Sequence, residues 1–334
     1  MRLPDPRGTI SAALVDHLRD DAPLDPATVE RLRGLAAAVE DPLGDGDLQL
    51  ALAVAYEPHY SGFEGVGDHW EWDPGLLGVR AGLERRFEEG LRAEVGDAAQ
   101  VRAGVPVDVA LRDVLEHPRL TAGPSLSRWV MRHADEEQFR EMLRQRSVYQ
   151  LREADPHTWA IPRITGPAKA ALIEIQADEY GGGRYERMHS VLFARTMRAF
   201  GLDTTYGAYW PLATPATLAT NNLITYFGLH RRWRGALLGH LAGVEMDSSA
   251  PCRRFANALR RLGYGEDATF FYDEHVEADA VHEQLAAVDM CGGFVGEDPQ
   301  RYADVLFGAA SLVAVEGRFA QALVGPWEAA AAAA

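Results

Sequence analysis

Apolar residues recur every three to four positions along most of the chain, and this spacing limits the fold more than any other feature. It is clear in VDVALRDVLEH (residues 107–117), EQFREMLRQRSVYQLRE (137–153) and YADVLFGAASLVAVEGRFAQALV (302–324). The period matches the 3.6 residues per turn of an α-helix that buries one face. We find no convincing alternating strand pattern and no series of βαβ units. The sequence therefore predicts an all-α fold.

Two stretches rich in glycine, proline or aromatic residues divide the helical pattern. YEPHYSGFEGVGDHWEWDPG is a long loop candidate, and EHPRLTAGPS is the next boundary. From them we predict an N-terminal helical region at residues 1–115, a larger helical domain at 116–328 and a low-complexity alanine tail at 329–334.

Charge and composition exclude several classes of partner. The formal net charge of −16 argues against nucleic acid and anionic membranes, which both require a basic surface. Two cysteines, Cys252 and Cys291, are too few for a disulfide framework or a cysteine metal site. The N-terminus lacks the apolar segment of a signal peptide, and no run of about eighteen apolar residues occurs. We expect a cytoplasmic protein that binds a small-molecule substrate.

The segment FYDEHVEADAVHEQ (271–284) places three metal-binding residue types on one helix face. His275, Asp279 and His282 are spaced i, i+4 and i+7, which confines them to about 60° of arc. Two imidazoles and a carboxylate form a metal-ligand pattern. The alternative is a solvated acidic face, because the same segment also carries three glutamates.

A second cluster surrounds three consecutive glycines at 181–183. Such a run inside a helix costs about 2–3 kcal/mol relative to alanine, so a kink there would need a purpose. One purpose is to bring Glu179 and His189 onto one face. Alternatively, Glu186 and His189 form the Glu-x-x-His pair used in helix-bundle di-iron sites. A third interpretation is a loop between two helices with solvated acids.

Three further residues are weaker candidates for the same site. Glu153 ends a helical run just before a proline-rich turn, and His157 in that turn is expected to be exposed. Glu245, with His240 on the same predicted helix, is expected to cap or support rather than to bind a metal.

Together these residues resemble the ligand set of the haem-oxygenase-like di-iron oxidases, many of which are called the iron-containing redox enzyme family. The similarity runs from about Leu120 to Trp327 and includes EADPHTWAIPRI, EIQADEYGGGR and RRWRGALLGHLA. Both the Glu-x9-His spacing and the His-x3-Asp-x2-His spacing match the N-oxygenating members. The resemblance implies a seven-helix, haem-oxygenase-like bundle, with residues 1–115 as an added helical region. It also implies that two irons are held by Glu153, Glu179, His189, His275, Asp279 and His282.

The resemblance further implies how such an enzyme reacts. Two Fe(II) ions and O2 form a peroxo-di-iron(III) species that attacks an amino-acid-like, amine or fatty-acid substrate, with N-oxygenation favoured. Glu186 and Glu245 stay as alternative ligands or supporting groups, and Glu179 is preferred over Glu186. The substrate, the unidentified electron donor, the choice between monomer and homodimer and the role of residues 1–115 are left open.

Two rival functions remain at this stage. The chain would be a non-catalytic helical interaction protein if its metal site were degenerate. It would be a haem protein if the fold held a porphyrin, although a set of several carboxylates and imidazoles speaks against that.

Overall fold

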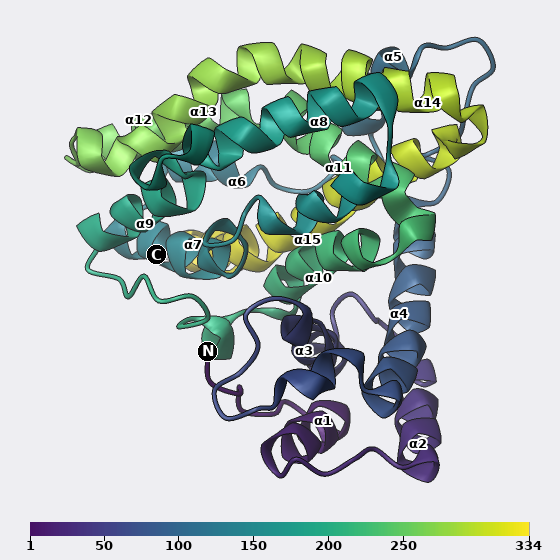
Figure 1. The fold of residues 1–334 in the computed structure, drawn as a ribbon. Coiled ribbons are helices and arrows are strands. Elements are labelled where there is room, and N and C mark those ends of the chain that lie inside the picture. The colour runs from purple at the N-terminus through teal and green to yellow at the C-terminus, as the bar shows by residue number, and fades with distance from the viewer. Residues whose placement is uncertain (334) are drawn as a thin grey trace.

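The computed structural model describes residues 1–333, with the side chains of 277–281 outside the described set. Every regular element within this range is a helix, so the predicted all-α class is confirmed. Figure 1 shows long helices of the later chain stacked above a smaller group formed by the helices of the first 95 residues. Among the described residues, no helix has both the length and the apolar character needed to cross a membrane.

The N-terminal region contributes five α-helices and two short 3₁₀ turns. They are α1 (Thr9–Arg19), α2 (Pro26–Ala37), α3 (Gly46–Tyr56), η1 (Glu57–His59), η2 (Asp68–Trp72), α4 (Pro74–Val95) and α5 (Val107–Leu115).

Helix α3 lies at the centre of that region. Every one of its residues from Leu48 to Tyr56 is buried, because α1, α4 and α10 pack around it. A helix buried on all sides has little freedom to move, so the residues that follow it in η1 begin from a fixed point.

The remaining chain forms the larger bundle. Its elements are α6 (Leu126–Arg132), α7 (Glu136–Gln150), η3 (Asp155–Arg163), α8 (Gly166–Glu179), η4 (Gly181–Gly183), η5 (Tyr185–Arg187), α9 (His189–Ala199), η6 (Trp210–Leu212), α10 (Pro215–Leu229), η7 (Arg231–Trp233), α11 (Arg234–Asp247), α12 (Ser249–Arg261), α13 (Glu266–Gln284), the π-helix η8 (Leu285–Gly292), α14 (Gly293–Glu297), η9 (Pro299–Arg301) and α15 (Tyr302–Ala333).

Two glycines allow α11 and α15 to pack with their backbones in contact. A side chain at Gly239 would collide with the backbone of Val305, and one at Gly308 would collide with the backbone of Ala236. Glycine is therefore required at both positions. This contact fixes α11, which carries two candidate site residues.

The buried apolar residues form two clusters, and the candidate site lies where they meet. The larger cluster joins the N-terminal helices to α8, α10, α11 and part of α15. The smaller cluster joins α6, α7, α9, α12 and α13. The division of the chain near residue 115 stays a prediction, since the larger cluster includes residues on both sides of it.

Candidate metal centre

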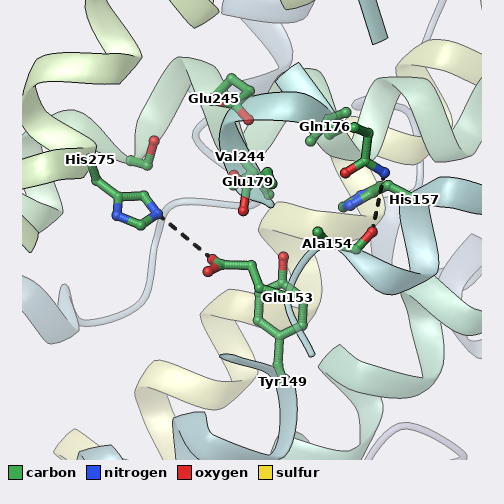
Figure 2. Close-up of a pocket in the computed structure, with 11 residues that line it drawn as sticks. Tyr149, Glu153, Ala154, His157, Gln176, Glu179, Val244, Glu245 and His275 are labelled. Atoms are coloured by element: carbon green, nitrogen blue, oxygen red, sulfur yellow. Dashed lines mark hydrogen bonds and ion pairs between the residues drawn. The ribbon is translucent and has the colours of Figure 1, made fainter. Parts of the chain in front are cut away.

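The candidate ligands come from five segments that meet around one buried pocket, which is lined by Glu153, Glu179, Glu245 and His275 (Figure 2). His189 lies beside Glu179, and His282 lies beside Glu245. Each sits at a helix end, in a turn or on an inward helix face. The segments are the turn after α7 with Glu153, the last residue of α8 with Glu179, the first residue of α9 with His189, α11 with Glu245, and α13 with His275 and His282.

The glycine run forms a loop rather than a kink within one helix. Gly181, Gly182 and Gly183 have φ of 64°, 60° and 78°, the left-handed region in which glycine has no steric penalty. A side chain at Gly181 would also collide with the backbone at Arg187. A loop between two helices is therefore correct, and the mid-helix interpretation is wrong. The solvated acids that went with the loop interpretation are correct for Glu186 and wrong for Glu179, which is largely buried.

This loop nevertheless brings Glu179 and His189 together. Glu179 Oε2 lies 3.1 Å from His189 Nδ1, and both side chains are largely buried. Neither atom has an aligned hydrogen-bond partner among the described residues. Buried polar atoms rarely lack a hydrogen bond, and this arrangement suits two ligand atoms that bind a metal ion.

The protonation of this pair follows from its proximity. Burial opposes the charge on Glu179, but His189 outweighs it and lowers the pKa of Glu179 to about 2. Burial likewise opposes the charge on His189, while Glu179 raises the pKa of His189 to about 9. In the metal-free protein at neutral pH, His189 therefore holds a proton that a metal would displace.

His275 completes a compact group with Glu153 and His189. Its Nδ1 donates to the carbonyl oxygen of Phe271 at 2.7 Å, which leaves Nε2 as the atom that faces the pocket, 4.0 Å from Glu153 Oε1. One ligand atom from each of Glu153, His189 and His275 lies within 4.8 Å of the other two. Burial lowers the pKa of His275 to about 4, so its imidazole is neutral at pH 7 and able to bind a metal.

His282 faces a second carboxylate. Its Nδ1 lies 3.4 Å from Glu245 Oε2, and its Nε2 donates to Asp178 Oδ2 at 2.9 Å. The bond to Glu245 is the main reason that the pKa of His282 rises to about 9. Asp178 was not among the residues that the sequence analysis singled out. The side chain of Asp279 lies outside the described residues.

The structure also shows where Glu186 and His157 lie. Glu186 is exposed on η5, so the arrangement favours Glu179 as the partner of His189. His157 was expected to be exposed, and this prediction is wrong: it is 3 % exposed. The proline-rich turn packs as η3 against α10 and α11, which buries the ring and places His157 Nε2 3.2 Å from Nδ1 of His240. Burial lowers the pKa of His157 to about 4.

The pocket encloses a cavity of about 20 Å³. That volume holds a water molecule or an ion and is far too small for a porphyrin. Tyr149 also lines it, one helical turn before Glu153 (Figure 2). Burial, together with the carboxylates of Glu153, Glu179 and Glu245, raises the pKa of Tyr149, so its phenol keeps its proton.

The residues present fit a metal centre. Carboxylates and imidazoles form the mixed oxygen and nitrogen set that suits iron. In addition, the two atoms without aligned hydrogen bonds, on Glu179 and His189, face each other, and Glu179 lines this pocket. These side chains could therefore hold a cation once His189 and His282 lose their protons.

The match to a protein family also points to iron. The sequence pattern of the iron-containing redox enzyme family matches residues 140–317, which is more than half of the chain. The chain is also similar to a nitrosourea synthase from Streptomyces achromogenes subsp. streptozoticus, at 30% identity over 136 residues. That match spans 41% of this chain but only 29% of the relative. Among solved structures, it is similar to a CADD-like protein of unknown function from Nostoc punctiforme PCC 73102, with a TM-score of 0.49 and 13% identity over 71% of this chain and 98% of that one.

Proposed function

Because the chain belongs to the iron-containing redox enzyme family, we propose that it is a non-haem di-iron enzyme that uses O2 to oxidise a small metabolite. The proposed iron ligands are Glu153, Glu179, His189, His275, Asp279 and His282, with Glu245 as a seventh candidate. When bound, the two irons would supply the electrons that reduce dioxygen.

The observation that carries this proposal is the convergence of Glu153, Glu179 and His275 on one buried cavity, with His189 beside Glu179. Four ionisable side chains are costly to bury unless they serve a ligand. Here they come from four different segments, and two of their donor atoms lack aligned partners in the described structure. Shifted pKa values among the side chains of a pocket are themselves typical of functional sites.

The surrounding residues support this role in specific ways. Phe271 fixes the tautomer of His275 through its carbonyl oxygen, so that Nε2 stays available. The amide of Gln150 lies 2.6 and 2.9 Å from the two oxygens of Glu153 and, with its nitrogen facing them, donates to that carboxylate. His157 lines the cavity and shares a hydrogen bond with His240 through their ring nitrogens. Buried neighbours exclude bulk water from all of these groups.

We further propose that the reaction oxidises nitrogen in an amino or guanidino compound. The spacing of the candidate ligands favours this class, and the curated relative is named for making a nitrosourea, a compound with an oxidised nitrogen. Since this chain spans less than a third of that relative, its own substrate and its electron donor are assigned only as classes.

Anaerobic loading with Fe(II) tests the proposal. We expect about two irons per chain and O2 uptake that increases when amines, amino acids or guanidino compounds are added. His275→Ala and Glu179→Ala should each reduce bound iron and lower O2 uptake at least about a hundredfold, as loss of a ligand removes a needed charge or donor. Glu186→Ala, which removes an exposed carboxylate from the same loop, is the matched control and should behave like the wild type. A wild-type protein that binds no iron would favour the interaction-protein alternative.

A further inference from the structure

A buried ion pair links the N-terminal region to the turn that carries Glu153. Arg152 Nη1 lies 3.0 Å from Glu57 Oε2, and the two side chains are only 5% and 0% exposed. The partners are 95 positions apart in the sequence. Glu57 directly follows the buried helix α3 and lies outside the segment that matches the family pattern.

Other contacts hold the same guanidinium in one orientation. Arg152 Nη2 donates to Asn221 Oδ1 at 3.1 Å, and its Cζ lies 4.0 Å from the ring centre of Tyr60. Tyr206 donates its hydroxyl to Glu57 Oε2 at 2.9 Å. The arginine is thus held by Glu57 and Tyr60 from the N-terminal region and by Asn221 from the bundle.

Stability alone does not account for this arrangement. Taking two charges out of water costs several kcal/mol per ion, and apolar side chains of similar volume often stabilise a fold as well or better. The cost is visible here, since burial raises the pKa of Glu57 in spite of Arg152. Glu57 Oε1 and Arg152 Nε also lack hydrogen-bond partners in the described part of the chain. What the pair does provide is a fixed place for the backbone at residue 152.

That backbone position matters because the next residue enters the candidate metal centre. After α7 ends at Gln150, consecutive residues of the turn are fixed to different neighbours. Arg152 faces Glu57, Glu153 faces the cavity, and Gln176 donates to the carbonyl oxygen of Ala154 at 3.2 Å (Figure 2). Tyr180 then donates to Asp155 Oδ1 at 2.7 Å. The contacts of Arg152 with Glu57 and Tyr60 tie this turn to the N-terminal region.

We infer that Glu57 and Arg152 are positioning residues for the metal centre: they set where Glu153 presents its carboxylate, and this is one role of residues 1–115. The inference rests on the proposed function, because it concerns the metal that Glu153 would bind. Ligands whose supporting contacts are lost typically bind metal 10- to 100-fold more weakly.

The test replaces the pair in the full-length protein with apolar residues of similar size, as Glu57→Leu with Arg152→Met. Co(II) serves as the probe, since its visible absorption reports the donor set around it. We expect a melting temperature close to that of the wild type, at least about tenfold weaker binding of Co(II) and an altered absorption spectrum. A merely structural role would change the melting temperature and leave the spectrum of bound Co(II) as it was.

A second ion pair on the same helix is the matched control. Arg146 Nη1 and Nη2 lie 2.8 and 2.6 Å from the two oxygens of Glu316, and this pair joins α7 to α15 without leading into the turn. Arg146→Met with Glu316→Leu should leave both the affinity for Co(II) and its spectrum unchanged. If the Glu57/Arg152 double variant does not fold, Glu57→Asp keeps the charge but withdraws it by one methylene, and it should show the same weaker binding in smaller measure.

The outcomes separate the two proposals. A wild-type protein that binds Co(II), with a folded Glu57/Arg152 variant that binds it equally well and with the same spectrum, overturns this inference and leaves the proposed function in place. A Glu57→Asp variant that binds Co(II) with the affinity of the wild type would also overturn this inference and leave the proposed function in place. A wild-type protein that binds no Co(II) removes the proposed function and this inference together.

Discussion

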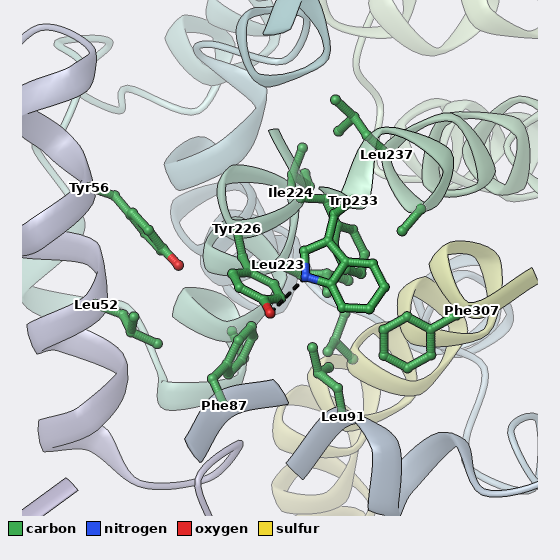
Figure 3. Packing of buried hydrophobic residues seen from close by; sticks show 14 of the residues in the cluster. Leu52, Tyr56, Phe87, Leu91, Leu223, Ile224, Tyr226, Trp233, Leu237 and Phe307 are labelled. Carbon is green, nitrogen blue, oxygen red and sulfur yellow. Dashed lines mark hydrogen bonds between the residues drawn. The ribbon is translucent and has the colours of Figure 1, made fainter. Parts of the chain in front are cut away.

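Two buried regions of this protein treat their polar atoms in opposite ways. The aromatic cluster formed by Phe87, Tyr226, Phe227, Trp233 and Phe307 packs where α4, α10, η7 and α15 meet (Figure 3). Trp233 Nε1 donates to the hydroxyl oxygen of Tyr226 at 2.7 Å, and that hydroxyl donates to Glu88. At the pocket of Figure 2, by contrast, the carboxylate of Glu179 faces His189 without an aligned hydrogen bond.

The two regions therefore differ in whether their polar atoms are paired within the protein or available to a ligand. Polar atoms that are fully paired stabilise the fold and leave nothing for a ligand. Carboxylates that pair with protonated imidazoles, by contrast, can exchange those protons for a metal ion. Substitutions in the aromatic cluster should therefore change mainly the free energy of unfolding, and substitutions in the pocket should change mainly the affinity for metal.

The largest expected effect on stability is in the aromatic cluster. Trp233→Ala should lower the free energy of unfolding by about 3–5 kcal/mol, because it leaves a cavity among packed rings. Denaturant titration measures this loss. Co(II) affinity should stay at the wild-type value under conditions where the variant is folded.

Trp72→Ala is the control for that variant, since Trp72 is 67% exposed. Its free energy of unfolding should change by less than about 0.5 kcal/mol. A loss below about 1 kcal/mol in Trp233→Ala, or a coupled loss of metal binding, would contradict the separation of the two regions.

The next effect concerns pH. The pKa values of His189 and His282 are about 9, above the ordinary 6.5, so both rings carry protons at neutral pH that a metal has to displace. Raising the pH removes these protons, and the apparent affinity for Co(II) should increase as pH rises towards 9 and then level off. Each proton displaced contributes up to about tenfold, or 1.4 kcal/mol, per pH unit.

Isothermal titration at several pH values, with direct counting of the protons released, measures this dependence. His189→Gln should release one proton fewer when Co(II) binds, so its affinity for Co(II) should depend less steeply on pH. An affinity that is constant between pH 7 and 9 would mean that the two rings are already neutral.

The smallest effect has opposite signs for stability and for binding. Burial raises the pKa of Glu245, so at pH 7 its charge costs the metal-free protein stability. Glu245→Gln should increase the free energy of unfolding on the order of 1 kcal/mol above the folded-state pKa. The increase should vanish at a pH below about 4.5, where the carboxyl group is neutral in both states. Metal binding should weaken at the same time.

Thermal unfolding with and without Co(II) checks both signs. Glu186→Gln, which changes an exposed carboxylate, should alter neither quantity. A Glu245→Gln variant that is less stable without metal would show instead that the carboxylate of Glu245 stabilises the metal-free fold.

Local patterns in the sequence were sufficient for the fold class and for much of the site. The helical period predicts the all-α fold, and the spacing of His275 and His282 places both on α13. Tyr149 could have been found from its position one turn before Glu153. The exposure assigned to His157 was wrong because a proline turn carries no information about what packs on it.

Long-range contacts set the rest and leave no local signal. Nothing around Glu57 or around Arg152 indicates that these residues pair, since the contact depends on α3, α10 and the turn after α7 meeting in space. Asp178 and Glu245 face His282 for the same reason: separate helices bring them there. Tertiary packing, rather than propensity, decides such contacts.

The glycine turn between α8 and α9 has a consequence for chains that have lost most of their structure. Glu179 and His189 are ten positions apart, whereas Glu153 and His275 are more than a hundred apart. Closing the longer span costs about 2 kcal/mol more in chain entropy. In a partly unfolded molecule, this hairpin would be the remnant that still holds a carboxylate and an imidazole within reach of one cation.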